Sequence, residues 1–196
     1  MSKDHLKQLE DNLKQAQEAL ASYKNVLRIP SKQYELFTDS TGLEWEVLFV
    51  DGGKAVISPR QPTGERVCYN KNNKWSEYVD SDLRNAQEKW FENELCPKIK
   101  DVALEVDVDN RAYAIPKVGT GVKVFALSLD EYRKYYHGLD LWHRFDKWFW
   151  LRSAGDFGNA VSIVGNGGIW STGGTDNMSS NFSFRPAIWV NLKIKI

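Results

Sequence analysis

Few residues in this chain have the types and spacing that metal chemistry requires. Glu105, Asp107, Asp109 and Asn110 form the most compact group of oxygen ligands, and Ca²⁺ prefers such ligands. A calcium loop also needs a glycine for its sharp turn, and Gly119, the next glycine, lies too far along the chain. The alternatives are therefore a calcium site and, more simply, the solvated face of a strand.

The remaining reactive side chains also lack the arrangements that catalysis uses. His137 and His143 have no cysteine or histidine partner at zinc-binding spacing. The cysteines, Cys68 and Cys96, do not indicate a disulfide framework, and reduced thiols are the simpler interpretation. No nucleophile-elbow or phosphate-loop motif is present. We therefore predict no metal, no cofactor and no enzymatic activity.

The C-terminal part of the chain has the composition of a binding surface. Residues 153–184 carry only two charged side chains, those of Asp156 and Asp176. Most of the other residues in this segment are Gly, Ser, Thr or Asn. Small polar residues interspersed with aromatic ones are typical of antibody-like binding sites, because aromatic rings supply contact area at low entropic cost. The alternative is an ordinary loop-rich edge whose aromatic residues belong to the core.

Strands and turns are expected to hold this segment. Residues 148–152 form an aromatic anchor, and residues 160–164 read as a strand. Glycines at 165–168 favour a turn, after which residue 169 starts a returning strand, and residues 173–177 indicate a second turn. A final buried strand is expected at 184–190. These patterns predict a structured segment and not a flexible linker.

The preceding region alternates strands with helices. Residues 44–50 and 54–58 read as a hairpin around Asp51-Gly52-Gly53, and residues 59–74 as a loop. Ser81 is a candidate cap for a helix that reaches about Cys96, and Ser128 with Glu131 forms a capping box. The order lacks βαβ regularity, so we predict an α+β fold.

The N-terminus has a strong helical repeat. Apolar residues are spaced three and four apart over three heptads, at Leu6, Leu9, Leu13, Ala16, Leu20, Tyr23 and Leu27. This narrow seam favours a coiled coil between copies of the chain, and Pro30 ends the helix. We predict an oligomeric stalk, with a trimer favoured, over residues 1–29 and a ligand-binding domain over 30–196. The alternative is a helix that packs on its own domain.

Charge and hydropathy exclude several partners. The chain has 26 basic and 26 acidic residues, so no net field attracts nucleic acid or an anionic membrane. No run of 18 apolar residues indicates a membrane span, and no apolar region follows the N-terminus as in a signal peptide. We expect synthesis in the cytoplasm, no membrane insertion and no nucleic-acid partner.

Several motifs point to a known family. Residues 150–155 (Trp-Leu-Arg-Ser-Ala-Gly) and 184–189 (Phe-Arg-Pro-Ala-Ile-Trp) resemble the closing elements of a bacterial and phage domain family of unknown function. The usual elements are Trp-Leu-Arg-Ser-Pro-Gly and Val-Arg-Pro-Ala-Leu, so Ala154 and Phe184 are departures. The earlier pieces at 45–48 and 124–128 also fit, and the resemblance covers roughly residues 40–192.

This family is similar to proteins with a C-type-lectin-like fold and to the variable proteins of diversity-generating retroelements. The resemblance implies that Arg152 and Arg185 belong to the scaffold and that the segment between them is altered to change ligand specificity. The ligand-binding positions would then be Asp156, Phe157, Asn159, Ser162, Val164, Asn166, Trp170, Thr172, Asp176, Asn177, Ser179, Asn181 and Phe182.

The resemblance implies a receptor-binding or display protein. Its ligand would be a protein or glycan on a cell surface, and a homo-oligomeric stalk would raise weak affinity by avidity. A virion-associated location fits this expectation by analogy. Two alternatives remain: a structural domain for virion or envelope assembly, and an enzyme built on the lectin-like fold.

Overall fold

The computed structural model describes residues 5, 7–8, 11–17, 27–71, 78–110, 117–139, 144–154, 160–165, 168–176 and 181–194. Within these residues the protein is a mixed α+β domain in which strands predominate and helices are short. The predicted α+β class is therefore confirmed.

The first sheet carries the strands nearest to the domain's N-terminus. Among the described residues it has five strands in the order β1 (Leu36–Thr38), β2 (Glu44–Asp51), β3 (Lys54–Pro59), β12 (Pro186–Asn191) and β7 (Phe125–Ala126). β2 and β3 form the predicted antiparallel hairpin. Gly52 and Gly53 occupy its turn with φ of 54° and 82°, a backbone region that favours glycine.

The second sheet carries the C-terminal segment. Its five strands in the described chain are β10 (Gly168–Asp176), β9 (Ala160–Gly165), β8 (Phe149–Ala154), β11 (Asn181–Phe184) and β4 (Thr63–Cys68), in this order. β11 pairs parallel with β8 and antiparallel with β4. The prediction of a loop throughout residues 59–74 was therefore wrong, because β4 becomes a strand by pairing with β11, far away in sequence.

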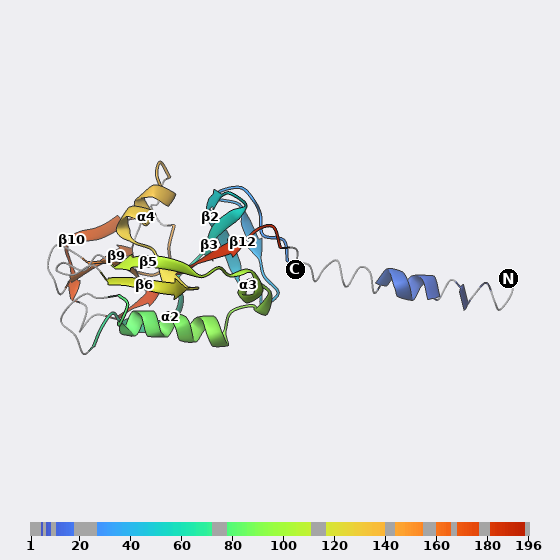
Figure 1. Cartoon of the computed structure of the whole chain (residues 1–196), viewed down its shortest axis with the longest axis horizontal. Coiled ribbons are helices and arrows are strands. Elements are labelled where there is room, and N and C mark those ends of the chain that lie inside the picture. The colour runs from blue at the N-terminus through green and yellow to red at the C-terminus, as the bar shows by residue number, and fades with distance from the viewer. Residues whose placement is uncertain are drawn as a thin grey trace.

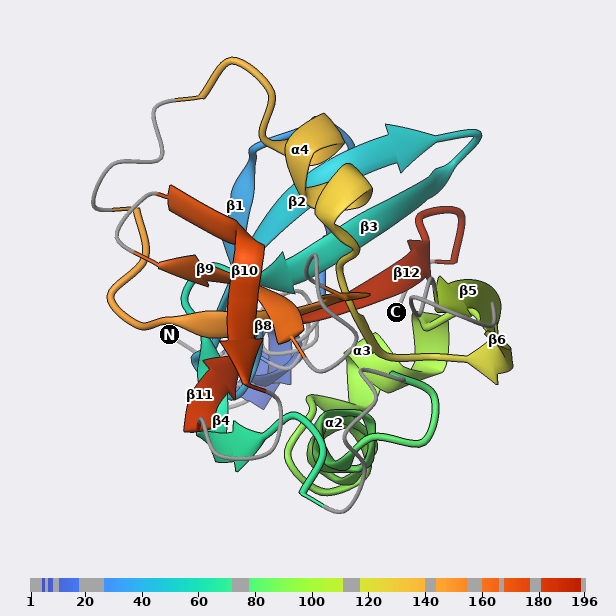
Figure 2. The same cartoon turned by 90° about the vertical axis from the view of Figure 1, so that its left-hand side faces the viewer.

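Short helices and a hairpin cover the sheets. The helices are α2 (Asp82–Asn93), α3 (Pro97–Val102) and α4 (Leu129–Tyr135), and the hairpin joins β5 (Val106–Asn110) to β6 (Lys117–Val122). Figure 2 shows α2 and α4 on opposite sides of the strands. β6 ends at Val122, and the short β7 follows it within three residues.

Both predicted helix caps are confirmed. The Ser81 hydroxyl accepts a hydrogen bond from the Arg84 amide at 3.0 Å and starts α2. At α4, Ser128 and Glu131 form the reciprocal capping box. These bonds satisfy amide groups that a helix start leaves without partners.

The N-terminal helix lies outside the folded domain. Residues 11–17 are helical and exposed, Leu13 by 60%, and Figure 1 shows this segment away from the domain. Leu27 and Ile29, by contrast, are not helical and pack against the core. The prediction that the helix reaches residue 29 was therefore wrong, because residues 27–29 are not helical. No described helix is long and apolar enough to cross a membrane.

Candidate ligand-binding surface

The predicted binding segment forms one edge of the second sheet. β9 and β10 pair antiparallel, with Gly168 opposite Gly165 and Trp170 opposite Ile163, as the predicted strand, turn and returning strand require. The predicted turn at 173–177 was wrong for residues 173–176, because β10 continues to Asp176. The pairing register of β10 with β9 shifts between Trp170 and Thr175. The extra residues there, which include Gly173 and Gly174, are accommodated without ending the strand, as in a β-bulge.

The structure sorts the predicted site residues into distinct environments. Five of them lie on β9, β10 or β11, and the structure describes only their backbone: Ser162, Trp170, Thr172, Asp176 and Asn181. Those outside the described residues are Asp156, Phe157, Asn159, Asn166, Asn177 and Ser179. Val164 is fully buried in the core, so its assignment to the surface was wrong. Phe182 is half-buried and lies on β11.

Phe182 belongs to a row of residues that crosses the sheet. Its neighbour on β4 is Val67. The parallel register of β11 with β8 brings it beside Trp148, the residue that precedes β8, and the two rings stack with centroids 6.1 Å apart and planes at 27°. Trp148 is also half-buried. We call Trp148, Phe182 and Val67 the aromatic row.

The Trp148 indole is held against the backbone of β9. A Cβ atom on Gly165 would lie 2.2–2.6 Å from three carbons around the fusion of the two indole rings. Such distances are far shorter than van der Waals contact, so only glycine leaves room for the ring. The indole therefore covers Gly165 with its face, in a fixed place on the sheet.

The same face of the sheet is buried farther along the strands. Trp150 and Phe184, two residues beyond Trp148 and Phe182, are 0% and 3% exposed. Phe184 contacts Trp90 of α2 edge-on, and the Trp150 indole donates a hydrogen bond to the Val67 carbonyl at 2.8 Å. The aromatic row is thus the partly exposed margin of a buried aromatic layer.

Arg152 ties the second sheet to the first. It lies on β8, is 3% exposed, and donates to the Ala126 carbonyl of β7 at 2.8 Å. It also forms an ion pair with Glu131 of α4, whose second carboxylate oxygen is 3.0 Å from the guanidinium. The predicted scaffold role of Arg152 is confirmed.

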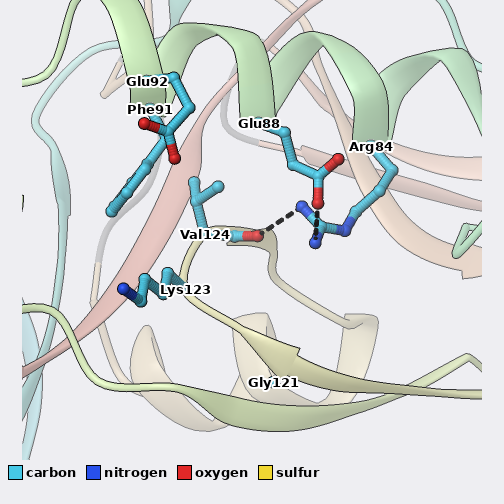
Figure 3. A pocket seen from close by; sticks show the side chains of 7 residues that line it. All are labelled: Arg84, Glu88, Phe91, Glu92, Gly121, Lys123 and Val124. Carbon is cyan, nitrogen blue, oxygen red and sulfur yellow. Dashed lines mark hydrogen bonds and ion pairs between the residues drawn. The ribbon is translucent and has the colours of Figure 1, made fainter.

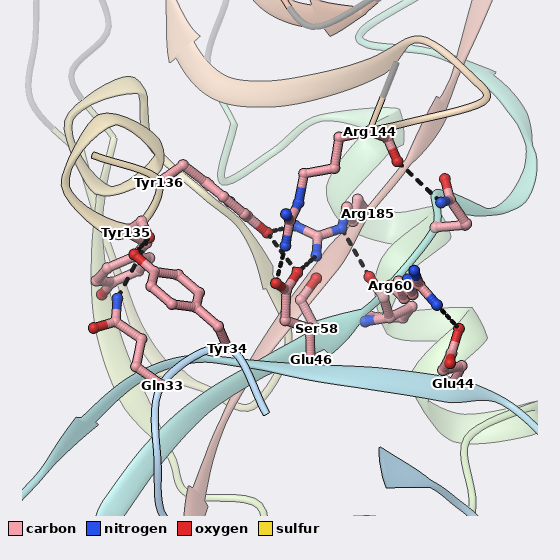
Figure 4. Close-up of polar contacts among 12 residues, drawn as sticks. Gln33, Tyr34, Glu44, Glu46, Ser58, Arg60, Tyr135, Tyr136, Arg144 and Arg185 are labelled. Carbon is pink, nitrogen blue, oxygen red and sulfur yellow. Dashed lines mark hydrogen bonds and ion pairs between the residues drawn. The ribbon is translucent and has the colours of Figure 1, made fainter. Parts of the chain in front are cut away.

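Arg185 lies where the chain passes from β11 in the second sheet to β12 in the first. Its Nε donates to the Pro59 carbonyl at 2.7 Å, and its Nη2 donates to Glu46 at 3.1 Å. Tyr136 and Arg144 converge on the same carboxylate (Figure 4). Arg185 and Glu46 are 2% and 1% exposed, so this residue also belongs to the scaffold, as predicted.

The Tyr136 phenol stays neutral within this cluster. Burial raises the pKa of Tyr136 far above its usual range, and Arg185 opposes the shift only in part. The hydroxyl donates to Glu46 at 3.3 Å and accepts from Arg185. Tyr136 therefore bridges a buried cation and a buried anion through hydrogen bonds.

Comparison with known proteins identifies the family. Residues 47–192 match a family described as a domain of unknown function (DUF6273). The chain belongs to the DUF6273 family. The matched part of this DUF6273 domain runs from β2 to the end of β12 and leaves out the N-terminal helix. No curated protein and no solved structure matches the chain significantly.

The acidic cluster and the histidine of the DUF6273 domain lie on other elements than the aromatic row. Glu105 and Asp107 are exposed at the β5 hairpin, and His137 is exposed, whereas His143 is outside the described residues. Within the described part of the chain, no group of three or more His, Cys, Asp and Glu side chains could hold a metal ion. The thiols of Cys68 and Cys96 are buried and form no disulfide with each other.

Two features of the DUF6273 domain were not predicted from sequence. Trp148 was assigned only to the anchor at 148–152, although its spacing of two from Trp150 places both on one face of a strand. Its partial exposure depends on tertiary packing, which the spacing does not show. No sequence pattern pointed to Glu46 as the partner of Arg185, because 139 residues separate the two in the chain.

Proposed function

We propose that this chain is a ligand-binding protein of the receptor-binding or display type, without catalytic activity. The ligand-binding surface comprises the aromatic row and the neighbouring strands β9 to β11. The observation that carries this proposal is the Trp148–Phe182 pair, which is half-buried and fixed over Gly165. Partly exposed aromatic residues on a rigid support are typical of binding hot spots.

The buried arginines support the proposal by making the surface rigid. Arg152 and Arg185 link the second sheet to the first at both ends of the segment between them. A surface that is ordered before binding loses little conformational entropy when a ligand docks. Side-chain changes between the two arginines would therefore alter ligand specificity without disturbing the scaffold.

We further propose a C-type-lectin-like fold and a relationship to the variable proteins of diversity-generating retroelements. The two sheets joined through the C-terminal strands are compatible with this proposal, and the resemblance of the closing motifs motivates it. Sequencing related copies of the locus tests it. Substitutions should concentrate between residues 156 and 182, whereas an even distribution along the chain would exclude the relationship.

The proposed stalk would present several domains together. Exposed helical residues 11–17 leave the apolar seam available for a coiled coil, and a trimer is favoured. Several weak sites on one stalk would bind a cell surface with increased avidity. We propose that the ligand is a protein or glycan on that surface and that the protein is virion-associated.

The binding test uses a glycan array and intact bacterial cells. Trp148→Ala and Phe182→Ala should each weaken binding by roughly 30-fold, since truncating an aromatic hot spot costs about 2 kcal/mol. Leu36→Ala is the matched control, because Leu36 is an exposed apolar residue on β1 of the other sheet. Circular dichroism checks that each variant folds.

Unchanged binding by both variants would show that the aromatic row is not the binding surface. If the chain binds neither glycans nor cells but co-assembles with virion or envelope proteins, the alternative of a structural assembly domain is correct.

A further inference from the structure

A pocket lies between α2 and the segment that joins β6 to β7. Its volume is about 300 Å³, near the lower limit for small-molecule sites. Figure 3 shows α2 forming one wall, with Lys123 and Val124 on the other side. The pocket shares no residue with the aromatic row.

The α2 wall is built by one face of the helix. Arg84, Glu88, Phe91 and Glu92 line the pocket, and residues separated by three, four and seven or eight positions lie on the same side of an α-helix. Phe91 is 5% exposed and Val124 is 2% exposed, so these two side chains supply apolar contact surface between charged groups.

The charges of the pocket are only partly neutralised within the protein. Arg84 pairs with Glu88 and donates to the Val124 carbonyl at 3.2 Å. Lys123 is 3.9 Å from Glu105, and both side chains are largely exposed, so this pair is weak. The Glu92 carboxylate has no side-chain partner among the described residues. Glu92 and Lys123 are thus the charges available to a ligand.

We infer that this pocket binds a small zwitterion, a free amino acid or a short peptide with an apolar side chain. Glu92 accepts hydrogen bonds from the ligand's ammonium group, and Lys123 donates to its carboxylate. The apolar side chain lies against Phe91 and Val124. A simple anion would face Glu88 and Glu92, and a simple cation would face Arg84 and Lys123, so a ligand with both charges fits the lining best.

Isothermal titration calorimetry on the full chain tests the inference. The probes are L-leucine and L-leucyl-L-leucine, which separate a free amino acid from a peptide, with N-acetyl-L-leucine and L-leucinamide as analogues that each lack one charge. At least one zwitterion should bind, and each analogue should bind about tenfold more weakly, because a hydrogen bond to a charged group has been lost.

The variants assign each charge to its residue. Glu92→Gln and Lys123→Gln should each raise the dissociation constant of the zwitterion about tenfold. In Glu92→Gln, N-acetyl-L-leucine should bind as well as L-leucine, because the partner of the ammonium group is gone. Glu94→Gln and Lys89→Gln change exposed charges beside the pocket residues and should leave binding unchanged.

Two results would overturn the inference. One is that neither zwitterion binds at its highest soluble concentration. The other is that the Glu92 and Lys123 variants, folded by circular dichroism, bind with the affinity of the parent chain. Neither result bears on the aromatic row, which the glycan and cell assays test separately.

Discussion

Buried charges at single positions hold the candidate surface in place. Arg185 is surrounded by Glu46, Tyr136 and the Pro59 carbonyl, and its guanidinium carbon lies 4.9 Å from the centre of the Phe145 ring. Charges removed from water are tolerated only when they are paired and hydrogen-bonded. The guanidinium meets this condition only because β2 and β3 of the first sheet and Tyr136 at the end of α4 each contribute a partner.

Loss of the Glu46 charge should therefore be costly. Glu46→Gln leaves the buried Arg185 without its anion, and we expect a loss of about 3–5 kcal/mol in the free energy of unfolding. Glu44→Gln, two residues earlier on β2, removes the exposed pair with Arg60 and should cost less than about 1 kcal/mol. Urea denaturation measures both, and equal losses would contradict the buried-pair interpretation.

The contact between Gly165 and Trp148 can be tested in the same way. Gly165→Ala places a methyl group against the indole and should destabilise the domain by about 1–3 kcal/mol. Trp148→Ala removes the obstacle. The double variant should then lose less stability than the sum of the single variants, whereas strict additivity in urea denaturation would show that the contact is absent.

At the scale of elements, Glu131, which caps α4, also attaches this helix to the second sheet. Glu131 accepts from the Ser128 amide at 2.8 Å and also pairs with Arg152 on β8. In addition, the Ser153 hydroxyl accepts from the Leu129 amide at 2.9 Å. The start of α4 is therefore attached to the second sheet at two adjacent residues, so helix and sheet should lose order together.

Removal of the cap should weaken this attachment. Ser128→Ala deletes the hydroxyl that accepts from the Glu131 amide, and an N-cap serine contributes about 1 kcal/mol. Thermal unfolding followed by circular dichroism should show the lower midpoint. Ser31→Ala, at an exposed position, is the control, and an equal midpoint for both variants would contradict the role of the cap.

At the scale of the whole molecule, a compact domain is joined to a helix that is exposed in the single chain. Leu13 is 60% exposed, although its sequence position belongs to an apolar seam. Coiled-coil association would bury it. The domain itself buries a set of aromatic residues around both sheets. Variants in the helix should therefore affect association, whereas variants in the domain should affect its folding.

Leu13→Asp should dissociate the oligomer without destabilising the domain. Size-exclusion chromatography with light scattering on the full chain should show a trimer for the parent and a monomer for the variant. Gln15→Asp, outside the seam on the same helix, should remain oligomeric. A parent chain that is already monomeric would remove the coiled-coil proposal.

The whole domain should also unfold at alkaline pH. Burial raises the pKa of Tyr78 to about 12, whereas an unfolded tyrosine titrates near about 10. The native state holds this proton more tightly, so its contribution to stability is complete below about pH 10 and is lost as the pH rises toward 12. Far-UV circular dichroism and tyrosinate absorbance should change together in this interval.

Tyr78→Phe identifies the residue responsible. The variant loses the hydrogen bond to Gln87 and should be less stable near neutral pH, but its stability should fall less steeply between about pH 10 and 12. Ionisation of the buried tyrosines while circular dichroism is unchanged would contradict this account.

Sequence alone determined the features that depend on neighbouring residues. The Ser81 and Ser128 caps, the hairpin turn at Gly52-Gly53 and the hairpin of β9 and β10 involve partners only a few positions apart, and periodicity and turn preferences encode them directly. The α+β class followed from the order of these elements.

Tertiary structure decided the features whose partners are distant in sequence. β4 becomes a strand only beside β11, Val164 is buried only because its face of the sheet meets the core, and Arg185 is stable only beside Glu46. Exposure and charge compensation depend on which surfaces the fold brings together, and no local pattern specifies that.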